Sequence, residues 1–251
     1  MRYFIQFSYF GKPYHGWQNQ PNAISVQEEL EKALSTLLRQ KIEVVGAGRT
    51  DAGVHAKVMY AHFDLEALED ERGGLVDRLN AFLPQDIAVQ AIHAMQPGAH
   101  ARFDALERTY QYWLVREKNP FLFEKAHLQR LPLDLGAMNQ AASFLLEYRN
   151  FECFSKSNSD VGTFDCDLRH ARWEVQGNLW VFTIKADRFL RNMVRAIVGT
   201  LLEVGLGKRS PGDIHALLES RDRGQAGVSV PAKGLYLTEV TYPKELFNEQ
   251  K

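Results

Sequence analysis

Apolar residues follow two periods along the first part of the chain. Alternate residues are apolar in the segments expected to be strands, whereas apolar residues three or four apart mark helices. Ser25 followed by Glu28 is the start signal of a helix. The predicted elements, in chain order, are strand 3–9, helix 26–38, strands 42–45 and 59–65, helix 75–82 and strand 87–92. This order is β-α-β-β-α-β.

The second part of the chain repeats this order. Its predicted elements are strand 108–115, a helix after Asp134, strands 167–175 and 179–185, a helix over 188–204 that Gly205 ends as a C-cap, a short extra helix begun by Ser210-Pro211, and strand 235–242. We therefore predict an α+β fold of two ferredoxin-like (βαββαβ) halves, 1–102 and 103–251. Their antiparallel sheets would join around a central cleft, with the helices on the outer face.

The helix over 188–204 has an unusual polar face. Arg188, Arg191 and Arg195 are three and four residues apart and would share one side of the helix, next to an apolar stripe that includes Val194 and Ile197. Such a face either lies in solvent or contacts a polyanion. Basic residues also surround the strand of Tyr110, Tyr112 and Trp113, namely Arg102, Arg108, Arg116 and Lys118. Basic and aromatic residues together suit binding of RNA backbone and stacking on bases.

The composition of the chain limits how these motifs can be interpreted. The 251 residues can form one large domain or two, and 45% hydrophobic and 24% charged residues are ordinary for a globular protein. With a net charge of −1, positive charge for RNA must be local. No apolar run approaches the length of a membrane span and no signal peptide is recognisable, so we expect a cytoplasmic protein without membrane contact. Cys153 and Cys166 form no CxxC pair, and Cys166 with His170 falls short of a metal site.

The segment 46–56, GAGRTDAGVHA, carries a single acid, Asp51, beside Arg49 among small residues. Small residues let a bulky ligand approach the backbone. The alternative is a glycine-rich hairpin with a surface Arg-Asp pair. A dinucleotide site is excluded, because Asp51 stands where the fingerprint needs its third glycine and no helix follows.

Five blocks, in this order, resemble the TruA family of tRNA pseudouridine synthases over Met1 to Pro243. They are YHGWQNQ (14–20), GRTDAGVHA (48–56), RTYQY (108–112), RFLRNMVR (188–195) and PAKGLYL (231–237). The resemblance implies isomerisation of uridine to pseudouridine at positions 38, 39 and 40 of the tRNA anticodon arm. It also implies a homodimer that uses no organic cofactor and has tRNA as its partner, and it implies no other protein partner. We expect no metal, because the chain has no ligand set with metal spacing. Phe10, where the family usually has an acid, and Ser229-Val230, where it has Thr-Ala, depart from the pattern.

The reaction assigns roles to these residues. It breaks the N1–C1′ bond and rejoins uracil through C5, which requires a carboxylate near the sugar and exclusion of water. Asp51 is the candidate, by attack on C1′ or by removal of the C2′ proton, and the sequence leaves both open. The resemblance implies that Arg195 holds Asp51, that Tyr110 stacks on the base and relays a proton, and that Leu235 packs against the pocket.

The remaining residues of these blocks have less specific assignments. Arg49 would hold the flipped nucleotide or fill its place in the stem. We expect His15 and His55 to be structural or to contact RNA, and Trp17 to lie in the core or to stack on RNA. A noncatalytic RNA-binding module would share the basic and aromatic features. It would not need a lone acid in a loop of small residues.

Overall fold

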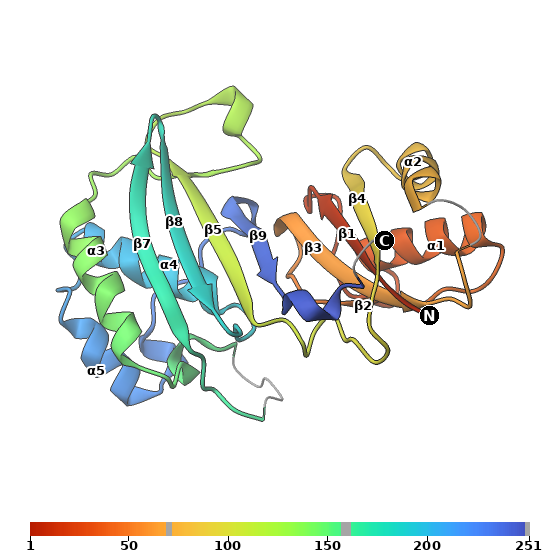
Figure 1. The fold of residues 1–251 in the computed structure, drawn as a ribbon. Coiled ribbons are helices and arrows are strands. Elements are labelled where there is room, and N and C mark those ends of the chain that lie inside the picture. Colours follow the sequence, from red (N-terminus) through yellow and green to blue (C-terminus); the bar gives the residue numbers. More distant parts are fainter. Residues whose placement is uncertain (69–71, 157–161, 249–251) are drawn as a thin grey trace. The chain divides into compact units, whose positions relative to one another are not determined.

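The computed structural model describes residues 1–68, 72–156 and 162–248 (Figure 1). The chain forms two compact units, one of Met1–Glu107 with Leu237–Lys251 and one of Arg108–Tyr236. Within the described residues, no helix is long and apolar enough to cross a membrane. Single turns of 3-10 helix occur at Pro120–Leu122, Leu145–Glu147, Glu152–Phe154, Arg223–Gln225, Ala232–Gly234 and Lys244–Leu246.

The first unit is built on an antiparallel sheet with β1 at its centre. Its elements are β1 (Arg2–Tyr9), α1 (Val26–Leu38), β2 (Val45–Gly46), β3 (His55–Asp64), α2 (Arg72–Phe82) and β4 (Ile87–Ala94). Strand β1 pairs with β3 on one side and β4 on the other, so that Ile5 lies opposite Ala61 and Ile92. Helix α2 packs on β4 and on α1. The predicted order of elements is confirmed for this unit, and Ser25 caps α1 through the amide of Glu28.

Two details of the first unit differ from the prediction. The strand expected over 42–45 is reduced to Val45–Gly46, because side chains of α1 bind the backbone before it: Ile42 N donates to Ser35 Oγ (2.9 Å) and Val44 N to Glu31 Oε1 (3.0 Å). The helix expected over 75–82 already includes residues 72–74.

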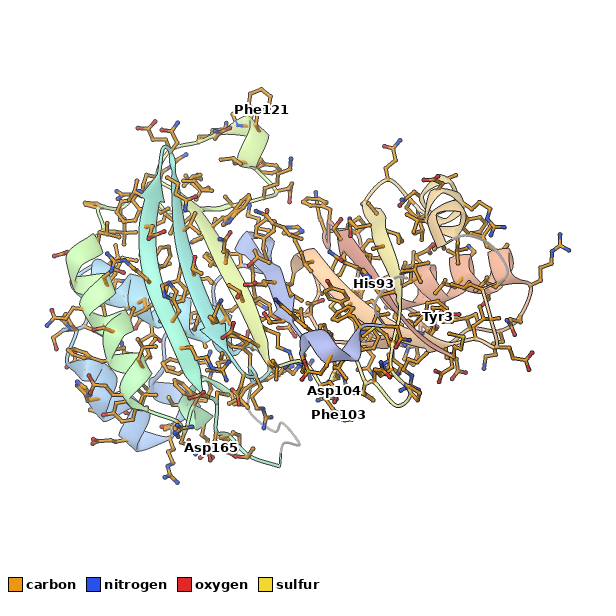
Figure 2. All side chains as sticks on the ribbon, viewed as in Figure 1. Tyr3, His93, Phe103, Asp104, Phe121 and Asp165 are labelled. Atoms are coloured by element: carbon orange, nitrogen blue, oxygen red, sulfur yellow. The ribbon has the colours of Figure 1, made fainter. Side chains whose placement is uncertain are left out.

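The second unit contains a sheet covered by three helices. Its elements are β5 (Glu107–Val115, whose first residue belongs to the first unit), β6 (His127–Leu128), α3 (Leu135–Phe144), β7 (Leu168–Gln176), β8 (Leu179–Ala186), α4 (Met193–Gly205) and α5 (Asp213–Ser220). Strand β8 pairs antiparallel with β5 and with β7, and β6 runs parallel to β5. Helix α3 packs on β7 and on α4. Figure 2 shows Phe121, 86% exposed, at the outer end of the loop between β5 and β6.

The basic helix is shorter than predicted. Asn192 has a left-handed backbone (φ 67°), which cannot continue a helix, and α4 begins at Met193. Arg188 and Arg191 therefore precede the helix, and the prediction of one helical face with three arginines was wrong. Only Arg195 lies on α4.

Two predicted helix ends were also wrong. Gly205 is the last residue of α4 and not its C-cap, and an added Cβ there would be 2.5 Å from the sulfur of Met138 on α3. The C-cap is Leu206, and the left-handed residue that follows it is Gly207 (φ +70°). Gly207 N donates to Val204 O and Lys208 N to Glu203 O, the double hydrogen bond of a Schellman cap. Helix α5 begins at Asp213, after a turn in which Ser210 N donates to the Asp213 carboxylate.

The units divide the chain differently from the predicted halves 1–102 and 103–251. The first boundary follows Glu107, and a second falls within β9 (Leu235–Thr241), after Tyr236. Tyr242, just after β9, is anchored on earlier residues of the first unit, because its hydroxyl donates to Ala101 O (2.6 Å) and its ring contacts Phe4 (5.2 Å). These contacts join residues far apart in sequence, so no local pattern reveals them.

Candidate active site

The backbone on both sides of Asp51 is held by hydrogen bonds to the first strand and the segment after it. The Thr50 hydroxyl lies 2.8 Å from the Tyr9 hydroxyl, and Thr50 O accepts from Trp17 N (3.2 Å). Asp51 O accepts from Val54 N (3.1 Å), which closes a turn over Ala52 and Gly53. The carboxylate therefore stands on a fixed backbone, although it lies in a loop.

Glycines let segment 10–17 lie directly on this loop. A Cβ at Gly11 would be 1.9 Å from Val54 O, and one at Gly16, whose φ is +98°, would be 2.5 Å from Thr50 O. Gly46 is covered by the ring of Trp17, at 2.6 Å from such a Cβ. Two sequence blocks, 14–20 and 48–56, are thus brought together. The small residues at 11, 16 and 46 serve contacts within the chain, whereas a Cβ added at Gly48 would have no heavy atom within 4 Å.

Two residues with open assignments, Trp17 and His55, now have structural ones. Trp17 is 3% exposed and packs against Phe7 (ring centroids 5.5 Å apart), so it is a core residue. His55 is 1% exposed, its Nδ1 accepts from Gly11 N (2.9 Å), and it stacks on the ring of Phe10 (4.4 Å). Because Nδ1 accepts, His55 is neutral with its proton on Nε2. His55 therefore supports the loop.

Phe10 and His15 complete the surroundings of the loop. Phe10, where the resembling family has an acid, covers the imidazole of His55. The side chain of His15 is exposed, and its backbone is bound by Ile24 O and by the Gln20 side chain. Asp51 itself is half-buried and Arg49 is exposed, so a ligand can reach both.

The aromatic strand of the second unit does not present all its rings to a ligand. Tyr112 is fully buried and donates its hydroxyl to Pro231 O (3.0 Å), and burial raises the pKa of its phenol. Trp113 stacks on Tyr236 with ring centroids 4.3 Å apart. Tyr110 is half-buried, and the edge of its ring meets Phe189 (5.1 Å). Tyr110 and Trp113 are both partly exposed, but Trp113 already stacks on Tyr236, so Tyr110 is the better candidate for stacking on a base.

Arg195 is held by a loop that follows α5. Its Nε donates to Val230 O (2.7 Å), and Val230 N donates to Arg195 O (3.2 Å). Leu235 is 6% exposed, at the start of β9. Asp51 and Arg49 belong to the first unit, and Tyr110, Arg195 and Leu235 to the second. The expected Asp51–Arg195 pair stays a prediction.

The other chemical candidates lie in ordinary structural positions. Cys153 and Cys166 are buried free thiols, and burial raises the pKa of each to about 12. No group of three or more potential metal ligands occurs in the described part of the chain. Arg108 donates to Asp187 O and Arg116 to Gln129 O, so part of the predicted basic surface binds the protein's own carbonyls.

Sequence reasoning missed several residues that build the site. Tyr9, at the end of the first strand, supports Thr50. Its signal was present but unspecific, since any strand tyrosine looks the same. Asn192, Ser229 and Arg223 form a bonded group beside Arg195. The spacing of these three residues in the sequence did not predict that they lie together.

Comparisons with known proteins identify the family of this chain. A family model described as tRNA pseudouridine synthase matches residues 5–104 and 142–243. Proteins named tRNA pseudouridine synthase A are similar over nearly the whole chain. The protein from Parabacteroides distasonis is 52% identical over 246 residues, covering 98% of both chains. The Bacteroides fragilis protein is 52% identical over 247 residues, again with 98% of both covered. A Francisella tularensis protein is 41% identical over 254 residues, covering 99% of this chain and 96% of its own. The chain belongs to the tRNA pseudouridine synthase family.

Proposed function

We propose that this protein isomerises uridine to pseudouridine at positions 38, 39 and 40 of the tRNA anticodon arm, with Asp51 as the catalytic carboxylate. The observation that carries the proposal is the Asp51 loop. A half-buried carboxylate stands on a backbone fixed by Tyr9 and Trp17 and next to open space at Gly48, in a member of this family.

The reaction needs no redox partner. The N1–C1′ bond breaks, the uracil turns while it is bound, a C5–C1′ bond forms, the C5 proton leaves and N1 gains a proton. Atoms and charge balance without a cofactor. Asp51 either forms a bond to C1′ as N1 departs or accepts the C2′ proton, and both routes require its negative charge. A fixed backbone keeps the carboxylate near the sugar through both halves of the reaction.

The other residues have supporting roles. Arg195 binds the Asp51 carboxylate and keeps it ionised in a site that excludes water. Tyr110 stacks on the uracil and exchanges a proton through its hydroxyl, and Leu235 packs on the opposite side of the pocket. Arg49, which is exposed, holds the flipped nucleotide or takes its place in the stem.

This site requires a particular assembly. We propose that residues 1–102 and 103–251 act as two ferredoxin-like halves around a central cleft, to which the first brings Asp51 and the second brings Tyr110 and Arg195. The protein works as a cytoplasmic homodimer, without cofactor or metal. The order of elements supports the two halves, and the small net charge of −1 supports a tRNA groove shared by two subunits.

The test is the substitution Asp51→Asn, assayed on tRNA labelled with tritium at uracil C5, because loss of the C5 hydrogen releases the label. We expect single-turnover release to fall by at least about 10³-fold, while the dissociation constant for tRNA stays within about threefold. The matched control is Glu66→Gln, which removes an exposed acid of the same unit and should leave both quantities unchanged.

Two outcomes contradict the proposal. Tritium release by the Asp51→Asn protein at the wild-type rate, in a sample shown to be free of deamidation, would remove Asp51 from the chemistry. A wild-type protein that binds tRNA but releases no tritium would be a noncatalytic RNA-binding module.

A further inference from the structure

The second unit contains an arginine that holds a loop together from inside. Arg223 lies in the 3-10 turn after α5 and is half-buried. Its Nη1 donates to Ala226 O (3.4 Å) and Gly227 O (3.3 Å), and its Nη2 donates to Ser229 Oγ (3.0 Å). One guanidinium group therefore binds three points of residues 226–230, which we call the 226–230 loop.

The 226–230 loop lies directly on the backbone of α4. A Cβ at Gly199 would be 1.9 Å from Val228 O, and a Cβ at Gly227 would be 2.7 Å from Thr200 N. Gly227 N donates to Thr200 Oγ1 (2.9 Å). Contact this close leaves no room for a side chain between loop and helix. The 226–230 loop is therefore held at one distance from α4 and in one register along it.

The same loop binds the residues at the start of α4. The Asn192 amide donates to Ser229 Oγ (2.6 Å), and Arg195 Nε donates to Val230 O (2.7 Å). Val230 N returns a bond to Arg195 O (3.2 Å). Because Nε is bound to the loop, the loop sets the plane of the Arg195 guanidinium, and the two terminal nitrogens are the ones that can take a carboxylate.

We propose that Arg223 is a positioning residue for pseudouridine formation: it holds the 226–230 loop in the one arrangement that orients Arg195. The inference rests on the proposed function, in which Arg195 holds the catalytic carboxylate. Arg223 does not contact the reacting atoms. It acts through Ser229, Val230 and Arg195 in turn.

The planar guanidinium group of arginine suits this position. Two nitrogens of one rigid group reach separate acceptors along the loop, whereas a lysine ammonium is a single point on a flexible stem. We therefore expect Arg223→Lys to behave like Arg223→Gln, although lysine keeps the charge. Arg221→Gln is the matched control, since Arg221 is exposed and two residues away.

The experiment has one arm without tRNA and one with it. In the first, nitrogen NMR follows exchange of the Arg195 Nε–H with water, with the signal assigned by its absence from Arg195→Lys. We expect Arg223→Gln to speed this exchange at least about tenfold, because a bonded N–H exchanges through opening of its bond. In the second, single-turnover tritium release falls about 10- to 100-fold while the tRNA dissociation constant changes less than about threefold. Arg221→Gln changes neither.

Each outcome decides the inference. A folded Arg223→Gln protein, shown by an unaltered circular dichroism spectrum, with unchanged Nε–H exchange or an unchanged rate overturns it. A rate that falls together with tRNA affinity also overturns it, because the loop would then serve binding. If the wild-type protein releases no tritium while Nε–H exchange responds as expected, the proposed function has failed and Arg223 remains only a clamp on Arg195.

Discussion

A histidine buried beside the connection out of the first unit shows how much one residue depends on its neighbours. His62 is 6% exposed, and its Nδ1 accepts from Ala101 N (3.1 Å). Its ring meets that of His100 at 4.5 Å. Burial lowers the pKa of His62 to about 4, with a smaller contribution from Arg2, while Asp64 and Asp104 act in the opposite direction. His62 therefore stays neutral near neutral pH and accepts the bond that fixes residues 99–104.

We predict that this histidine makes the protein less stable in mild acid. The unfolded chain takes up a proton at His62 near pH 6.5, whereas the folded protein does so only near pH 4. The contribution of His62 to the free energy of unfolding is therefore fully present above pH 6.5. It is lost as the pH falls towards 4, by at most about 3 kcal/mol. The test is urea unfolding at pH 7 and at pH 4.5 of wild type and of His62→Asn, which keeps an acceptor near Nδ1. Between these two pH values the free energy of unfolding of the variant should fall by about 2 kcal/mol less than that of wild type. His170→Asn, at an exposed site, is the control, and an identical loss in wild type and His62→Asn would contradict the prediction.

At the scale of elements, α4 is defined by what packs against it. Of its 13 residues, Met193, Val194, Ala196, Ile197, Val198, Gly199, Thr200, Leu201, Leu202, Val204 and Gly205 are buried. The helix can approach other backbone so closely because glycines stand at two contacts: Gly199 faces the 226–230 loop and Gly205 faces Met138. Glycine weakens a helix by about 1 kcal/mol relative to alanine, so packing decides these two positions against local preference.

We predict that Gly199→Ala destabilises the protein although alanine is the better helix former. The new methyl group would be 1.9 Å from Val228 O, a backbone atom that cannot turn away. Urea unfolding should show that the free energy of unfolding falls by about 1 to 3 kcal/mol. The comparison is Gly212→Ala, where φ is −67° and the nearest heavy atom is 3.9 Å away. That variant should be as stable as wild type, and equal stability of both variants would show that loop and helix separate freely.

At the scale of the whole molecule, the chain passes from the first unit to the second after Glu107 and returns after Tyr236. The first unit contributes Asp51 and Arg49, and the second contributes Tyr110, Arg195 and Leu235. Neither unit alone contains all the residues proposed for the reaction. The proposed function therefore depends on the intact chain, and the proposed homodimer extends this dependence to two chains.

We predict that the active species contains two protein chains of 28.7 kDa each. A subunit this small, with a net charge of −1, offers a limited basic track for an anticodon arm, and a second copy of the same surface extends it. Sedimentation velocity with labelled tRNA, at the protein concentration of the activity assay, measures the mass of the active complex. Full activity in a species with one protein chain would contradict the proposed dimer.

The sequence by itself determined the order of elements, most of their bounds, the family, and Asp51 as the acid to examine. Alternation and helical spacing are local consequences of burying one face of an element, so they can be read without knowledge of the partner. Spacing failed where a single backbone conformation overrode it. The left-handed Asn192 separates Arg188 and Arg191 from α4, and Gly207 rather than Gly205 is the glycine in the cap of that helix.

Only the tertiary structure decided which residues serve the chain and which face a ligand. Trp17 and Tyr112 match nucleic-acid motifs in sequence, yet both are buried. Gly48 borders open space, while Gly46 packs on Trp17. Arg223 carries no motif, yet it holds the loop that orients Arg195. Residues of the same type differ here through contacts with segments distant in the chain, and the free energy of those contacts exists only once the chain has folded.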